Sequence, residues 1–199
     1  KQYPADELNN ILMSSRLLLI ENEDRLTLVG TGMGRKQSEK YYSHKYLQAG
    51  NSLASSFSKL GFSFEDVTDV LLTHLHDDHV GGATYYDGDS IQLTFPNAIH
   101  WLTKAQYDWA INPNKREAGT YFKDNFVPIL DSGKLKLVEE EGMHIPGIHF
   151  RIFNGHTVGN IVPIVYYNDK QIAFMGDFIP FVASIPLPFI SSTDIQPLL

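Results

Sequence analysis

Residues 73–82 of this chain read Thr-His-Leu-His-Asp-Asp-His-Val-Gly-Gly, directly after the apolar run 70–72. Successive side chains alternate in direction along an extended segment, so His74 and His76 lie on one face and can bind the same metal ion. If the chain then turns into a helix, Asp78 and His79 point to a neighbouring position that fits a second ion. The segment therefore predicts a site for two ions at the end of a buried strand.

The donor atoms restrict which metal this site can hold. The chain contains no cysteine, which excludes disulfides, thiolate ligands and a cysteine nucleophile. Imidazole and carboxylate groups suit zinc, with manganese or iron as alternatives. We therefore expect two divalent ions held by histidine and carboxylate, with zinc as the first choice.

Two later segments follow predicted strands and carry further metal-ligand types. Residues 154–159 read Asn-Gly-His-Thr-Val-Gly, and residues 175–177 read Met-Gly-Asp. Each segment alone is an ordinary turn sequence. In this order, however, the three segments resemble the signature of the metallo-β-lactamase superfamily, and the resemblance extends over residues 13–190.

The resemblance implies a role for each candidate ligand. The first ion would be held by His74, His76 and His156, the second by Asp78 and His79, and both by a bridging Asp177. Members of the family usually bind the second ion with one more histidine, and no histidine follows His156 in this chain. We therefore expect the last ligand to lie outside these 199 residues, which read as cut at both ends.

Apolar runs, turns and capping residues predict alternating strands and helices. We expect strands over 13–20, 25–29, 70–73, 98–102, 135–138, 148–154, 161–167 and 171–175, and helices over 38–48, 52–60 and 103–111. Asn51 is the predicted N-cap of the second helix, and Gly61 its C-terminal stop. This order predicts an α/β protein in which two sheets face each other with helices outside, the αββα four-layer sandwich of the metallo-β-lactamase type. Residues 1–199 would form a single domain whose second half is incomplete.

Charge and hydropathy limit the partners. The chain has 16 Lys and Arg against 23 Asp and Glu, a net charge of −7, and no basic cluster, which argues against binding nucleic acid. The longest apolar stretch, 178–190, is too short for a membrane span and contains three prolines. We expect a small-molecule substrate, no membrane partner, and a homodimer as one option. The sequence is compatible with a cytoplasmic, periplasmic or secreted protein.

A hydrolase that uses a hydroxide shared by two ions is the function we expect. Two ions would lower the pKa of that water and polarise the scissile group. Asp78 would handle the proton as the catalytic carboxylate. The lack of cysteine and the match at Asp177 point away from the penicillin-cleaving branch. The sequence looks closer to N-acyl-homoserine lactonases and methyl parathion hydrolase, which implies a lactone, aryl ester or phosphotriester substrate.

The apolar run that follows Asp177 could line the substrate pocket, with Phe178, Phe181 and Phe189 as its predicted wall; a core or subunit interface is the alternative. Two other functions stay open at this point. One is an iron-dependent dioxygenase-type member of the same fold, and the other is a non-catalytic copy that binds a partner.

Overall fold

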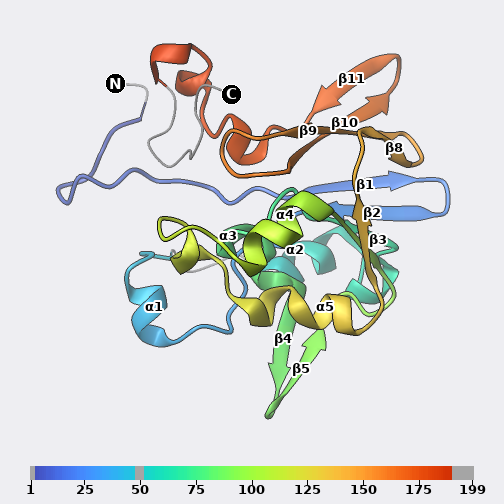
Figure 1. Cartoon of the computed structure of the whole chain (residues 1–199), viewed down its shortest axis with the longest axis horizontal. Helices are drawn as coiled ribbons and strands as arrows, with labels where there is room; N and C mark the ends of the chain where they lie inside the picture. Colours follow the sequence, from blue (N-terminus) through green and yellow to red (C-terminus); the bar gives the residue numbers. More distant parts are fainter. Residues whose placement is uncertain (1–2, 48–51, 190–199) are drawn as a thin grey trace.

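The computed structural model describes residues 3–47 and 52–189 (Figure 1). Its strands are β1 Leu18–Asn22, β2 Arg25–Val29, β3 Asp69–Leu71, β4 Thr84–Asp87, β5 Ser90–Leu93, β6 Ile99–Thr103, β7 Leu135–Val138, β8 Gly142–Ile145, β9 Ile148–Phe153, β10 Asn160–Tyr167 and β11 Lys170–Ala173. Its α-helices are α1 Glu39–Ser43, α2 Leu53–Leu60, α3 Asp77–Val80, α4 Lys104–Ile111 and α5 Val127–Asp131.

Two main sheets form the centre of the molecule. The first has the order β1-β2-β3-β6-β7, in which β1 runs antiparallel to β2 and the other neighbours are parallel. The second is antiparallel, with the order β11-β10-β9-β8. Figure 1 shows this second sheet as a separate layer above β1 and β2. A third, two-stranded sheet of β4 and β5 projects from the opposite side.

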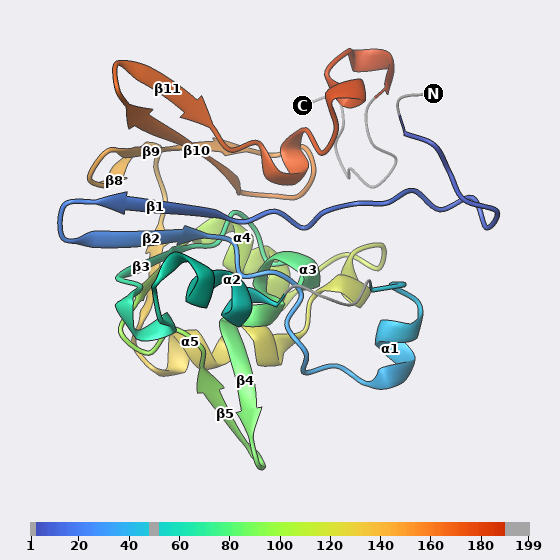
Figure 2. The same cartoon turned by 180° about the vertical axis from the view of Figure 1, so that it is seen from behind.

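Alternating side chains of the first sheet contribute to two separate cores. Leu71 and Trp101 point toward the second sheet and share a buried cluster with Phe150 of β9 and Ile161 of β10. Their neighbours point the other way and pack with α2, α4 and α5 in a second cluster, to which the sheet contributes Leu28, Val70, Leu72 and Leu102. Figure 2 shows from behind that α2 and α5 lie on the side of the first sheet opposite to the second sheet. The period-two pattern of these strands therefore places one sheet between helices and a second sheet.

The predicted α/β class with two facing sheets is confirmed. Within the described residues, α2, α4 and α5 cover the first sheet, and no α-helix covers the outer face of the second (Figures 1 and 2). The described part thus supplies three of the four predicted layers. None of the helices in these residues is long and apolar enough to span a bilayer.

Several boundaries differ from the predictions. The first strand begins at Leu18 rather than at residue 13. The helix predicted over 38–48 covers only Glu39–Ser43, and Tyr46 has a φ of 49°, a left-handed value that a continuing helix does not allow. Asn51 lies outside the described residues, and Ser52 caps α2 in a capping box with Ser55.

Some short elements were not among the predicted ones. These are β4, β5, α5 and β8, each of which is five residues or shorter. Short elements carry few apolar residues, so their periodicity is weak.

Candidate metal centre

Three loops at one edge of the facing sheets bring the candidate ligands together. The motif segment follows β3, His156 lies between β9 and β10, and Asp177 lies in a short 3-10 helix, Gly176–Phe178, after β11. The backbone N–H of Ile161 donates to the carbonyl oxygen of Thr73 at 2.8 Å. This hydrogen bond joins the two sheets directly beside the motif.

The motif changes from extended to helical backbone within its length. His76 has φ −62° and ψ 148° and is the N-cap of α3, whose first residues are Asp77 and Asp78. The predicted turn into a helix after His76 is therefore confirmed. The change directs the side chains on the two sides of His76 into one site from different angles.

The two glycines that end the motif serve a close backbone contact. A Cβ atom at Gly81 would lie 2.0 Å from the carbonyl oxygen of Met33, and one at Gly82 would lie 2.2 Å from that of Thr31. Lys36 also binds this region, since its Nζ donates to the carbonyl oxygen of Gly81 at 2.5 Å. The two glycines thus allow the motif to pack on the loop that follows β2.

The first group of candidate ligands consists of His74, His76 and His156. One ring nitrogen of each lies within 4.8 Å of the others, and all three residues are buried. Nδ1 of His76 lies 2.9 Å from Nε2 of His156. Nε2 of His74 is buried without a hydrogen-bond partner among the described residues. A buried nitrogen without a partner is costly, and a metal ion would satisfy it.

The second group consists of His74, His79 and Asp177, again with donor atoms within 4.8 Å of one another. Nε2 of His79 lies 3.2 Å from Oδ1 of Asp177, and Nε2 of His156 lies 3.5 Å from Oδ2 of the same carboxylate. Asp177 therefore stands between the two groups. Asp78 belongs to neither group, but its Oδ2 lies 3.7 Å from Nε2 of His79.

Burial and neighbouring charges determine the protonation of these groups. Burial holds the pKa of His74 well below its ordinary value, and the nearby imidazoles act in the same direction. Burial also acts to lower the pKa of His79, but the hydrogen bond and charge of Asp177 outweigh it and raise that pKa. The pKa of Asp177 is lowered because His79 outweighs the opposing effect of burial. The site thus combines a neutral imidazole with an ionised carboxylate, the forms that bind divalent metals.

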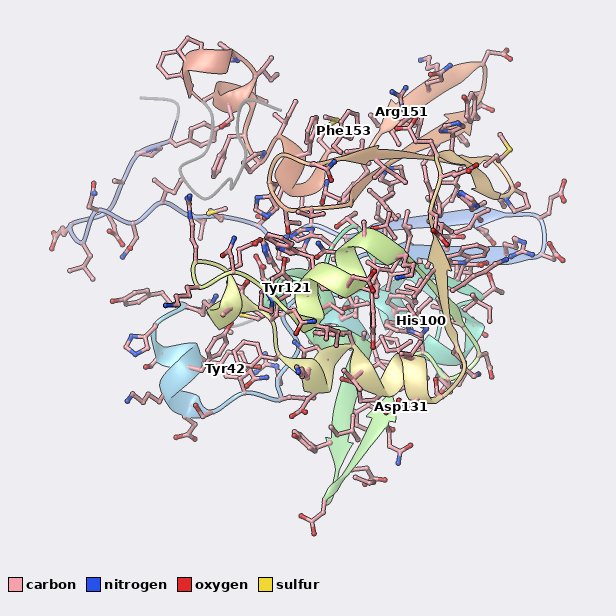
Figure 3. The ribbon with its side chains drawn as sticks, in the orientation of Figure 1. Tyr42, His100, Tyr121, Asp131, Arg151 and Phe153 are labelled. Atoms are coloured by element: carbon pink, nitrogen blue, oxygen red, sulfur yellow. The ribbon has the colours of Figure 1, made fainter. Side chains whose placement is uncertain are left out.

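The three predicted wall residues lie in different surroundings. The ring of Phe178 stacks on that of Phe153, with centroids 4.4 Å apart, and Figure 3 labels Phe153 on the second sheet. Phe181 meets Tyr3 edge to face at 5.2 Å. Phe189 is 66% exposed. Their contact with a substrate stays a prediction.

Three buried polar residues near the site had no part in the sequence argument. They are Gln106 on α4 and, in the following segment, Glu117 and Tyr121. Glu117 accepts hydrogen bonds from Trp109 and Tyr121 and contacts His76. Burial acts to raise the pKa of Glu117, but the hydrogen bonds with His76 and Trp109 outweigh it and lower that pKa. No local pattern marks these residues, because their contacts arise only from packing.

The sequence matches one protein family over most of its length. Residues 13–197 match the model of the metallo-beta-lactamase superfamily. The chain belongs to this superfamily. Its solved structural neighbours include a probable metal-dependent hydrolase from Staphylococcus aureus, which is 28% identical to this chain and superposes with a TM-score of 0.89. The match covers 98% of this chain and 69% of the hydrolase chain. AidC, described as a dizinc quorum-quenching lactonase, shares the fold at 24% identity, with a TM-score of 0.70 over 91% of this chain and 63% of its own.

Among curated relatives, the N-acyl homoserine lactonase AttM of Agrobacterium fabrum is 34% identical over 67 residues, 34% of this chain. That match spans only 22% of AttM. The two ligand groups support binding of divalent metal.

Proposed function

We propose that this chain carries the dinuclear metal centre of a hydrolase that cleaves a lactone, an aryl ester or a phosphotriester. The observation that carries the proposal is the convergence of two ligand groups, one of three histidines and one that includes Asp177, at a single sheet edge. The likeness to AttM, a protein named as a lactonase, supports the choice of substrate class.

In this proposal His74, His76 and His156 hold one ion, His79 and Asp78 hold the other, and Asp177 contacts both. Zinc is the metal we expect, with manganese or iron as alternatives. Divalent ions bound there supply Lewis acidity and a water activated at neutral pH.

The chain's own groups prepare the site for this chemistry. The three histidines of the first group are buried, so their ring nitrogens are shielded from bulk water. Oδ2 of Asp78 faces His79, and the Asp78 side chain is 40% exposed. A proton taken up by Asp78 during hydrolysis can therefore pass directly to solvent. Asp78 is the catalytic carboxylate of the proposal.

The substrate is expected to be neutral and fairly apolar. Aromatic rings lie immediately beyond Asp177, where Phe178 stacks on Phe153. The chain's net charge of −7 disfavours polyanions. Phe178, Phe181 and Phe189 are the residues we expect along the acyl or aryl part of the substrate.

A hydrolysis screen on the full-length protein tests the proposal. It compares lactones, aryl esters, phosphotriesters, a chromogenic cephalosporin and RNA, alongside elemental analysis for zinc, manganese and iron. We expect a small ester-like substrate to be preferred, and His76→Ala to lower its turnover by about 1,000-fold or more, because a ligand of the activating ion is lost.

His44→Ala is the matched control, since His44 is an exposed residue that directly follows α1. It should leave turnover unchanged. Turnover in His76→Ala equal to that of the wild type would contradict the site. A preference for RNA over every ester, or an iron-dependent oxidation in place of hydrolysis, would contradict the reaction class.

A further inference from the structure

Glu117 lies outside both ligand groups, yet its carboxylate contacts one of their members. Oε1 of Glu117 lies 3.2 Å from Nε2 of His76, and both side chains are buried. The opposite ring nitrogen of His76, Nδ1, faces the site, where it lies 2.9 Å from Nε2 of His156. His76 therefore presents one nitrogen to Glu117 and the other to the candidate metal centre.

The other neighbours of Glu117 leave its carboxylate no role except that of acceptor. The indole N–H of Trp109 donates to Oε2 at 2.6 Å, and an indole nitrogen is only ever a donor. The hydroxyl of Tyr121 donates to Oε1 at 3.2 Å. An ionised carboxylate accepts on both oxygens, so the nitrogen of His76 that faces it must carry the proton.

We propose that Glu117 is a positioning residue that holds His76 in the tautomer protonated on Nε2, which leaves Nδ1 free to bind the metal. This inference rests on the proposed function. A neutral imidazole has one protonated and one free nitrogen, and only the free nitrogen can bind a metal ion. Without Glu117, a proton on Nδ1 would block the ligand position.

The contact also restricts the orientation of the His76 ring. The ring of Tyr121 lies 5.1 Å from that of His76, between centroids. The Tyr121 hydroxyl in turn lies 2.9 Å from Oγ1 of Thr157, the residue after His156. Glu117 and Tyr121 therefore link two ligands of the first group through one buried hydrogen-bond network.

Glu117→Gln tests the proposal with little change in side-chain shape. The introduced amide has only one acceptor oxygen, and the donors at His76 and Trp109 compete for it. If the oxygen turns to Trp109, the amide N–H faces His76 and favours the tautomer with the proton on Nδ1. We expect zinc affinity, measured by competition with a chelator, to fall by about 10- to 100-fold.

A second change is designed to rescue the first. Trp109→Phe removes the competing indole N–H, so the introduced amide can turn its oxygen to His76. We expect Trp109→Phe alone to stay within about threefold of wild-type zinc affinity, since it leaves the contact to His76 intact. The double variant Trp109→Phe, Glu117→Gln should bind zinc more tightly than Glu117→Gln alone. A simple loss of packing predicts the opposite, because the losses from the two changes would then add.

The tautomer itself can be measured in the metal-free protein from the ¹⁵N chemical shifts of the His76 ring. We expect Nε2 to be protonated in the wild type and in the double variant, and Nδ1 to gain proton occupancy in Glu117→Gln. Wild-type zinc affinity in Glu117→Gln, an Nδ1-protonated ring in the wild type, or a double variant weaker than Glu117→Gln would each overturn the role of Glu117. Failure of the wild-type protein to bind zinc at all would instead contradict the proposed function.

Discussion

The side-chain oxygen of Gln106 accepts a hydrogen bond at 3.0 Å from the backbone N–H of Leu75, the residue between His74 and His76. The amide nitrogen of Gln106 donates to the carbonyl oxygen of Val158 at 2.5 Å, two residues after His156. One fully buried side chain of α4 thus joins the two loops that carry the first ligand group. The relative position of these loops depends on a residue that is not itself a candidate ligand.

Gln106→Leu should destabilise the protein through this link. The buried N–H of Leu75 and the carbonyl of Val158 would both lose their partner, which predicts a loss of about 2–4 kcal/mol in the free energy of unfolding. Urea denaturation measures the change. Gln92→Leu is the matched control, because the exposed side chain of Gln92 donates to the hydroxyl of Ser90 and to no backbone group among the described residues. Equal losses in both variants would contradict the role assigned to Gln106.

Gly81→Ala should also destabilise the fold, by about 1–3 kcal/mol, because the added methyl group overpacks a backbone contact. The new Cβ would lie 2.0 Å from the carbonyl oxygen of Met33. Gly119→Ala serves as the control, since a Cβ there has no atom within 4 Å. Thermal unfolding compares the two variants. A melting temperature for Gly81→Ala as high as that of the control would show that the contact is easily relaxed.

The stability of the protein should depend on pH through His100, which lies in the interior on β6 (Figure 3). Burial lowers the pKa of His100 to about 4. The unfolded chain, with a pKa near 6.5, then binds a proton that the folded state does not. The stability that this residue contributes is complete above pH 6.5 and is lost as the pH falls toward 4.

His100→Leu should remove this dependence. The difference in unfolding free energy between wild type and variant should change by up to about 3 kcal/mol between those two pH values, at 1.36 kcal/mol per pKa unit. Urea titrations at several pH values measure it. His44→Leu, on the surface, should leave the pH profile as it is. A constant difference between wild type and His100→Leu over this range would mean that His100 keeps its ordinary pKa.

The proposed metal centre predicts a specific stoichiometry. Metal-supplemented full-length protein should contain two divalent ions per chain, and Asp177→Ala should lose much of the second, because Asp177 stands between the two ligand groups. Elemental analysis measures both. Asp108→Ala, at an exposed carboxylate on α4, is the control. Two ions retained in Asp177→Ala would rule out its bridging role.

Removal of the metal should lower the melting temperature of the wild type. An ion that binds only the folded state raises the free energy of unfolding. The increase grows with the logarithm of the ratio of the ion concentration to the dissociation constant. Dialysis against a chelator, followed by return of zinc, measures the effect by thermal unfolding. We expect the loss to be reversed by zinc in the wild type and reversed less in His76→Ala. An unchanged melting temperature after complete metal removal would contradict binding at this site.

The sequence alone determined the elements whose pattern is local. The strands over 25–29 and 135–138 match β2 and β7 residue for residue, because an apolar run between turn residues defines a strand without reference to the rest of the fold. The motif of residues 73–82 was equally informative. Its spacing sets the directions of its side chains as soon as the backbone is extended and then helical.

Only the tertiary structure decided how the separate segments meet. His76 and Glu117 are 41 positions apart in the sequence, and Gln106 and Leu75 are 31 positions apart. No periodicity or short motif relates the two residues of either pair. Their contacts exist because α4 packs on the first sheet and places Gln106, and in the following segment Glu117, against the ligand loops. A hydrogen bond between distant residues depends on the packing of every element that separates them, and that information is not present in any single stretch of the chain.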